Sequence, residues 1–167
     1  MFNQLTKKDI EDMMAEIEDR KVNIRPKLLE AVKEARAHGD LSENFEYYAA
    51  KKEKNANESR IRFLERMIKT AEVIDDTSKD DEVGINDTVT VRFEDDGTED
   101  KVTIVSTMRN DSLKGLVSIE SPIGKALLGH KVNDRVEVVV NKDFSYYLTV
   151  MEIAKDNLGE EAKLRSF

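Results

Sequence analysis

Hydrophobic residues recur at steps of three and four along residues 5–74, which is the spacing of one face of an α-helix. The pattern has two halves, one from Ile10 to Ala35 and the other from Phe45 to Ala71. Each half leaves a narrow apolar stripe, and charges of both signs fill the other faces. Two such stripes in succession are typical of a two-helix coiled coil. We therefore predict an antiparallel helical hairpin with arms of about 30 residues, or about 45 Å.

Two positions interrupt the helical pattern. Pro26 lacks a backbone donor, so it is predicted to start a new helical segment after a kink or short break. Gly39 is typical of the position just beyond a helix C-terminus, so the arms are predicted to turn there, with the hairpin tip at residues 37–46. Asp40 and Glu43 have the spacing of a capping box, which predicts that Asp40 caps the second arm.

Beyond a charged stretch the hydrophobic period changes to two. Val89, Val91 and Phe93 alternate with polar residues, and four further short runs are also predicted strands. A short helix is predicted within residues 121–129. This pattern predicts a small, mostly antiparallel α+β domain. The predicted organisation is a hairpin at 1–75, a charged linker at 76–84, the α+β domain at 85–154 and a helical or frayed charged tail at 155–167.

Composition narrows the class of protein. Charged residues make up 37% and hydrophobic residues 39%, which suits narrow helical seams and one modest core rather than a large enzyme interior. Cysteine is absent, which excludes disulfides and thiolate metal sites. There is neither a signal-peptide pattern nor a run of about 20 apolar residues. We therefore expect a cytoplasmic protein without a membrane-spanning helix.

The net charge of −8 is carried mainly by the second half, with −1 in residues 1–75 and −7 in residues 76–167. This acidity weighs against a protein that coats nucleic acid by itself. A basic face is compatible with the balanced first half, where the candidates are Arg36, Lys51, Lys52, Lys54, Arg60 and Arg62. The alternative is a solvated mixed face, which the intervening Glu53 and Glu58 favour.

No pattern for a self-contained active site is found. The chain has no phosphate-binding glycine loop, no HExxH motif and no Ser-His-Asp set. Its two histidines, His38 and His130, are far apart in the sequence, and neither has a second His or Cys nearby to complete a zinc site.

The strongest local feature is the acidic tip, where Asp40, Glu43 and Glu46 follow one another at a predicted helix start. Carboxylates so placed can share a hard cation such as Mg²⁺, with the remaining ligands supplied by water or by another molecule. The alternative is that the same carboxylates only cap the helix and complement its dipole. Spacing alone favours capping. Tyr47 and Tyr48 can likewise be seam residues rather than stacking platforms.

Two longer runs carry a resemblance to a known family. The run Glu34–Tyr47, with Arg25-Pro26 before it and Ala49-Ala50 after it, resembles the hairpin signature of bacterial GreA/GreB transcript cleavage factors. The run Ser121–Gly129 resembles the signature of that family's C-terminal domain. The domain order and chain length also agree, so the resemblance covers nearly the whole chain. The distribution of basic residues resembles GreA more than GreB.

The resemblance implies a function as well as a fold. The α+β domain would be FKBP-like, and the hairpin would enter the secondary channel of a bacterial RNA polymerase whose nascent RNA 3′ end has been extruded by backtracking. Asp40 and Glu43 would help to hold a second Mg²⁺ and its attacking water beside the polymerase's own ion. The polymerase would be the nuclease, and this chain an accessory factor, not an enzyme, that binds no cofactor alone.

The resemblance also assigns contact residues. Arg36, Tyr47, Lys51 and Lys52 are expected to contact the polymerase or RNA. Ser121, Pro122, Gly124 and Lys125 are expected to dock on the polymerase at the channel rim. The free protein is expected to be a monomer.

Three other functions stay open. Within the family, the chain could inhibit or modulate the polymerase without stimulating cleavage. From a different class, it could be a scaffold that dimerises through the hairpin. An FKBP-like domain could also isomerise prolyl bonds, although the absence of Trp argues against the aromatic-lined cup that such sites need.

Overall fold

The computed structural model describes residues 3–39 and 43–166, which form two compact units. One unit is residues 10–71, and the other joins residues 3–9 to residues 72–166. Each unit is considered by itself. No helix in the described ranges is both long enough and apolar enough to cross a membrane.

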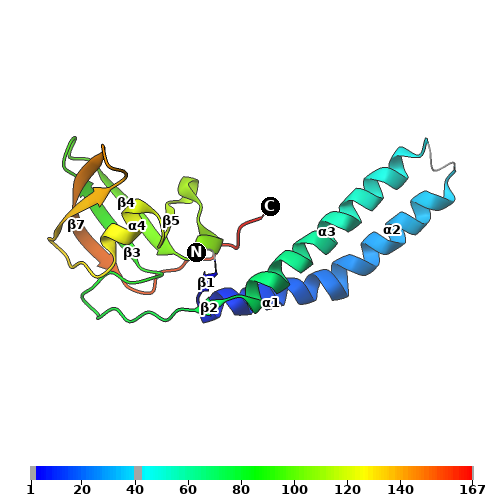
Figure 1. The fold of residues 1–167 in the computed structure, drawn as a ribbon, viewed down its shortest axis with the longest axis horizontal. Helices are drawn as coiled ribbons and strands as arrows, with labels where there is room; N and C mark the ends of the chain where they lie inside the picture. The colour runs from blue at the N-terminus through cyan, green and yellow to red at the C-terminus, as the bar shows by residue number, and fades with distance from the viewer. Residues whose placement is uncertain (1–2, 40–42, 167) are drawn as a thin grey trace. The chain divides into compact units, whose positions relative to one another are not determined.

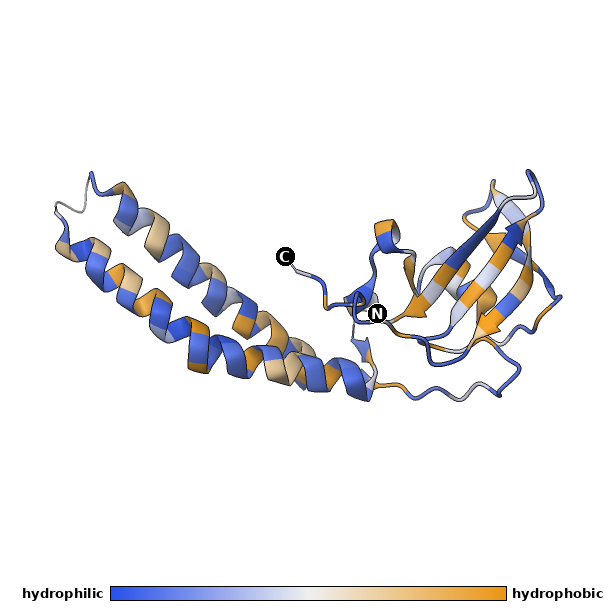
Figure 2. Cartoon of the chain, turned by 180° about the vertical axis from the view of Figure 1, so that it is seen from behind, coloured by the Kyte–Doolittle hydropathy of each residue, from blue (hydrophilic) through white to orange (hydrophobic). Residues whose placement is uncertain are grey.

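The first unit is the predicted antiparallel helical hairpin (Figure 1). Its first arm consists of α1 (Lys7–Asp19), a π-helix (Arg20–Ile24) and α2 (Arg25–Ala37), and its second arm is α3 (Phe45–Lys69). Tyr47, Ile61 and Leu64 of α3 are buried, as are Met13 and Ala35 of the first arm. Figure 2 shows that hydrophilic residues dominate the rest of the arms. The helical period therefore predicted this unit correctly.

The break near Pro26 takes the form of a five-residue π-helix. The amide of Arg25 donates to the carbonyl of Arg20, five residues earlier, and α2 begins with Pro26 in its first turn. In a continuous α-helix, Pro26 would leave the carbonyl of Val22 without its donor, and the ring would clash with that oxygen. A locally wider turn is a known way to accommodate such a conflict within one arm.

The second unit is built on a mixed five-stranded sheet with the strand order β5-β4-β3-β7-β6. The strands are β3 (Thr88–Phe93), β4 (Glu99–Val105), β5 (Leu116–Ser118), β6 (Arg135–Val139) and β7 (Ser145–Ala154), with the short helix α4 (Pro122–Leu127) between β5 and β6. Within this sheet, β4 and β5 pair in parallel and the other pairs are antiparallel. The α+β class predicted from the sequence is confirmed.

Alternation along the strands forms the core of this unit. Val89 and Val91 of β3, Ile104 of β4 and Leu148 and Val150 of β7 have no exposed surface. Figure 2 shows the alternating hydrophobic and hydrophilic bands along these strands. Side chains at every second position point to one face of a sheet, so a period of two buries one face and leaves the other wet.

The first residues of the chain also belong to this unit. β1 (Gln4–Leu5) pairs in parallel with β2 (Glu72–Val73). Thr6 and Asp9 then form a reciprocal capping box, in which each backbone amide donates to the other side chain, at 2.9 and 3.1 Å. The sequence pattern assigned these residues to the hairpin and contains no signal for this association.

A buried ion pair fastens this N-terminal segment. The Nε atom of Arg109 donates to Oδ1 of Asp9 at 2.6 Å, and the two side chains are only 3% and 2% exposed. Arg109 also donates from Nη1 to the carbonyl of Ala162 at 2.6 Å. One guanidinium therefore holds both the start of the chain and its end.

The expectation that the tail is helical or frayed is wrong for residues 155–166. This segment is irregular and packed, with Leu158 and Ala162 against Val105 and Leu116. Lys155 donates to Asp87 at 2.6 Å. Burial of these few apolar side chains and the carbonyl contact with Arg109 outweigh the helical tendency of the charged sequence.

The buried pair generates a prediction. Asp9→Asn keeps a cap acceptor but leaves the Arg109 charge uncompensated, so it should lower the free energy of unfolding of this unit by about 3–5 kcal/mol. Native-state hydrogen exchange at the Val91 and Val150 amides measures the change. Glu99→Gln, which breaks the half-exposed Arg92–Glu99 pair, should cost no more than about 1 kcal/mol. Equal losses in both variants would contradict the assigned role of the pair.

Candidate functional site at the hairpin tip

The start of α3 is organised by Asn44. Its Oδ1 accepts a hydrogen bond from the amide of Tyr47 at 3.0 Å, which is the N-cap interaction. Its Nδ2 donates to the carbonyl of Ala35 at 2.5 Å. Ala35 lies in the last turn of α2, and its carbonyl also accepts from the backbone amide of His38 at 3.2 Å. One side chain therefore caps α3 and adds a second hydrogen bond to the end of α2.

This arrangement corrects the predicted cap. The expectation that Asp40 caps the second arm is wrong, because the helix begins at Phe45 and its cap is Asn44. Asp40 itself lies outside the described residues, so its placement remains a prediction. Asn caps about as well as Asp. Its amide can also donate across the hairpin, which a carboxylate cannot do. Asn44, three residues before Tyr47, could have been predicted as the cap from the sequence, but the capping-box spacing of Asp40 and Glu43 favoured Asp40 instead.

Glu43 precedes the cap and is exposed. Within residues 3–39 and 43–166, no hydrogen bond or ion pair uses its carboxylate. Glu43 also precedes the cap of α3, so it is not the third residue of the helix. The capping-box role predicted for Glu43 is therefore wrong. Glu46 lies in the first turn of α3, exposed, with its Oε2 3.4 Å from Nδ1 of His38. Both carboxylates face solvent, where they can accept a ligand without breaking the fold.

The described carboxylates of the tip do not form a complete metal site. In the described part of the chain, no group of three His, Cys, Asp or Glu side chains could hold a metal ion. His38, Glu43 and Phe45 line a shallow depression of about 420 Å³ at the tip. Carboxylate oxygen is the ligand that Mg²⁺ prefers, but an octahedral ion needs more oxygens than Glu43 offers. Other ligands would have to come from Asp40, water or another molecule.

Arg36, Tyr47 and Lys51 are brought together on the tip side of the hairpin. The guanidinium carbon of Arg36 and the Nζ of Lys51 lie 5.5 and 5.9 Å from the centre of the Tyr47 ring. Hydrogen bonding by the Arg36 side chain, together with the two positive charges, lowers the pKa of the Tyr47 phenol. The ring itself is only 8% exposed, so Tyr47 is a seam residue that also aligns two cations. Lys52 is exposed and takes no part in this cluster.

The expected docking residues lie in the other unit, around α4. Ser121 caps this helix by accepting from the Gly124 amide at 3.1 Å, and it donates to the Ser118 carbonyl at 2.6 Å. A Cβ at Gly124 would lie 2.0 Å from the same carbonyl. Local packing and helix capping therefore account for the presence of serine at 121 and glycine at 124. Pro122 and Lys125 are exposed, and their docking role stays a prediction.

Two sequence families match the chain. Residues 3–73 match the family described as "Transcription elongation factor, N-terminal", and residues 77–155 match "Transcription elongation factor, GreA/GreB, C-term". A "Transcription elongation factor GreA" of Chloroherpeton thalassium is 44% identical over 86% of this chain and 91% of its own length. One of Lachnoclostridium phytofermentans is 40% identical over 93% and 97%. A crystal structure of the GreA factor homolog 1 protein of Thermus thermophilus is 27% identical, covering 90% of this chain and 97% of that one, with a TM-score of 0.40.

The role assigned to Asn44 can be tested by two substitutions. Asn44→Ala removes both hydrogen bonds and should cost about 1 kcal/mol at the start of α3. The expected result is faster hydrogen exchange at the Tyr47 and Tyr48 amides. Asn44→Asp keeps the cap acceptor and loses only the donor to Ala35, so its Tyr47 amide should stay protected. Asn55→Ala, at an exposed helix position, serves as the control. If Asn44→Ala leaves the Tyr47 amide protected, the cap assignment fails.

The cation cluster predicts a titration shift. Arg36→Met removes the group that most strongly stabilises the Tyr47 phenolate, so the pKa of Tyr47 should rise. Carbon-13 shifts of labelled tyrosine rings, followed from neutral to alkaline pH, measure this. Lys52→Met removes a nearby cation that makes no contact with the ring and should leave the titration unchanged. A shift of equal size in both variants would point to general charge rather than to Arg36.

Proposed function

The chain belongs to the GreA/GreB family of transcription elongation factors, and on that premise we propose that it stimulates an RNA polymerase to cleave backtracked nascent RNA. The observation that carries the proposal is Glu43, an exposed tip carboxylate that the helix cap does not use. In this proposal the hairpin enters the secondary channel of the polymerase, and the polymerase remains the catalyst.

The dimensions of the hairpin support such an insertion. The 25 residues of α3 correspond to about 37 Å of helix. The seam buries only narrow apolar stripes, so the hairpin carries its tip well beyond its own base without a bulky core. The tip residues between the arms are few, and the helices flanking them are capped at Asn44 and closed at His38. A narrow rod with a small acidic end suits a confined channel.

Each tip residue has a defined part in this proposal. Glu43, with Asp40, would supply carboxylate oxygens to a Mg²⁺ shared with the polymerase and would help to orient the water that attacks the RNA phosphodiester. The shared ion, when bound, would stabilise negative charge on the attacking and leaving oxygens. Arg36 and Lys51, aligned by the Tyr47 ring, present positive charge toward the RNA backbone, and Lys52 adds a more exposed cation. The exposed Pro122 and Lys125 of α4 provide a docking surface on the polymerase.

A second candidate function is inhibition. A family member that binds the channel without supplying effective carboxylates would block or slow the polymerase. Glu43 is exposed and is not the cap of α3, which supports stimulation over inhibition.

The test is RNA cleavage in backtracked elongation complexes with Mg²⁺. The chain should release short 3′ RNA fragments faster than the polymerase alone. Asp40→Asn and Glu43→Gln should each slow the stimulated cleavage on the order of 100-fold, because each removes a charged group that stabilises the reaction. Polymerase binding by both variants should be largely retained.

The matched control is Glu53→Gln, an exposed carboxylate on α3 two turns beyond the tip, which should stimulate fully. Binding without faster cleavage would overturn the proposal and leave inhibition as the function. Full stimulation by both tip variants would return the carboxylates to a local structural role.

A further inference from the structure

The seam of the hairpin contains one buried amide, Asn57, which is only 4% exposed. Its Oδ1 accepts from Nη1 of Arg20 at 2.9 Å, and its Nδ2 donates to the backbone carbonyl of Arg20 at 3.3 Å. Both contacts cross from α3 to the π-helix of the first arm. Burying an amide in an apolar seam costs free energy unless its polar atoms are hydrogen-bonded. Asn57 meets this requirement through contacts with the opposite arm.

The carbonyl that Asn57 reaches is the one at which the helix changes its step. Arg20 O accepts from the amide of Arg25, five residues on, instead of from a residue four positions on. An α-helical turn at this place would direct the same oxygen at the amide of Ile24. The Asn57 side chain therefore contacts the site where the extra residue of the first arm is absorbed.

Two bidentate ion pairs flank this contact. Arg60, 7% exposed, donates to both oxygens of Glu16 at 2.7 and 3.2 Å, and Arg25 donates to both oxygens of Glu58 at 2.9 and 2.8 Å. Burial acts to raise the pKa of Glu16, but hydrogen bonds from Arg60 and Arg20 lower it overall. Because bidentate pairs are geometrically specific, they restrict the alignment of the two arms.

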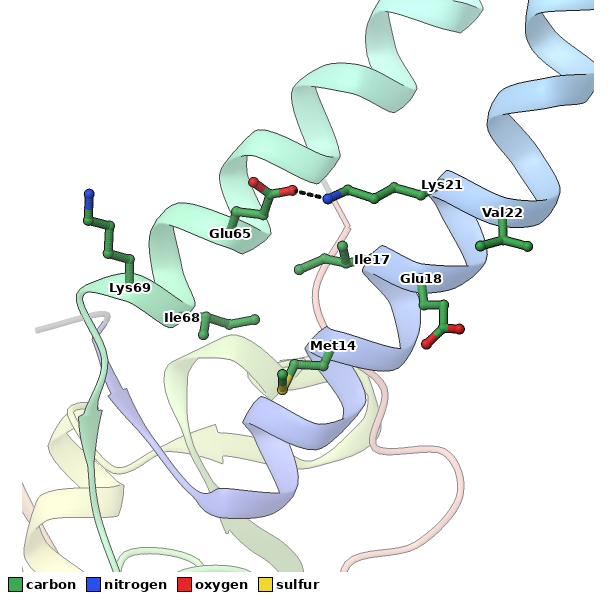
Figure 3. Close-up of a pocket in the computed structure, with 8 residues that line it drawn as sticks. All are labelled: Met14, Ile17, Glu18, Lys21, Val22, Glu65, Ile68 and Lys69. Carbon is green, nitrogen blue, oxygen red and sulfur yellow. Dashed lines mark ion pairs between the residues drawn. The ribbon is translucent and has the colours of Figure 1, made fainter.

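An exposed pair lies beside them. Figure 3 shows Lys21, on the π-helix, reaching across to Glu65 of α3, with Ile17 and Ile68 on the facing sides of the two arms. The Lys21–Glu65 distance is 2.8 Å, and both side chains are more than 40% exposed. Such a pair contributes little to stability. The alignment is therefore carried by the buried amide and the two arginine pairs.

We propose that Asn57 is a positioning residue: by holding the π-helix at Arg20, it fixes the phase of α2 against α3 and so the placement of the tip carboxylates. A single buried Asn is a known device for setting the register of a coiled coil, at a cost in stability. Here it would select a π-turn in its partner. The functional half of this inference rests on the proposed cleavage function, and the structural half does not.

The structural test uses spin labels attached to introduced cysteines. Labelling is specific because the chain has no cysteine of its own. One pair of introduced cysteines, at the exposed Ala15 and Glu30, spans the π-helix, and a second, at Glu30 and Glu53, spans the arms. In Asn57→Leu the extra residue is no longer held. Conversion to an α-turn rotates the following helix by about 100° and leaves Pro26 inside a kinked α-helix, which is the alternative to the wider turn. Electron–electron distance measurements should show shifts of several Å or a second population at both pairs.

Two variants make the assignment specific. Arg20→Met removes the guanidinium but keeps the carbonyl that Nδ2 contacts, so the distances should stay as in the wild type. Asn55→Ala changes an exposed amide on α3 and should also leave them unchanged. Unaltered distances in Asn57→Leu, or an equal shift in Arg20→Met, would overturn the proposal. Circular dichroism at 222 nm shows that each variant remains helical.

The functional test compares cleavage with stability. Asn57→Leu should bind the polymerase normally but stimulate cleavage roughly 10- to 100-fold less at saturating concentration, since small misplacements of reacting groups are costly. Its thermal stability should be unchanged or higher, a combination that a merely structural residue would not produce. Shifted distances with full stimulation would overturn the positioning role. If the wild type also fails to stimulate, the proposed function fails while the distance result still decides the role of Asn57.

Discussion

Two helices side by side share only one seam, and everything at the tip depends on that constraint. A globular domain surrounds each residue with neighbours, whereas a hairpin can stabilise its far end only through contacts passed along the two arms. Apolar stripes provide adhesion but tolerate sliding, because Leu, Ile and Ala contacts are similar from turn to turn. The amide of Asn57, the pairs Glu16–Arg60 and Arg25–Glu58 and the double contact of Asn44 are directional. These directional contacts fix how the two arms align and therefore where the tip lies within the hairpin.

The difference between periodic apolar packing and specific polar contacts also explains what could be predicted from the sequence. Periods of 3.6 and of two follow from which faces are buried, so the hairpin, the strands Thr88–Phe93 and Ser145–Ala154 and the α+β class could be predicted. The π-helix could be predicted only as an interruption at Pro26, because its form depends on the partner arm. The association of Asp9 with Arg109 could not be predicted at all, since it joins residues one hundred positions apart and leaves no periodic trace.

At the tip, the residues were found more readily than their roles. The motif around Asp40 and Glu43 identified the segment, but local spacing suggested the wrong cap, since both Asp and Asn fit the position in isolation. What distinguishes them is the carbonyl of Ala35 on the opposite arm, a contact visible only once the arms are paired. Tyr47 shows the same limit: its seam position could be predicted from the sequence, but the cationic surroundings of its hydroxyl depend on Arg36 of the opposite arm.

The parallel pairing of β1 with β2 has a consequence for how such a protein can change. Residues 10–71 form one unit, and the two strands of the other unit that precede and follow them in the chain are paired, Gln4 with Glu72 and Leu5 with Val73. In chain topology, the hairpin resembles a domain inserted into a loop of the other unit. Whole turns could be added to or removed from both arms together without disturbing the sheet. The length of the hairpin and the packing of the sheet can therefore be changed separately in engineered variants.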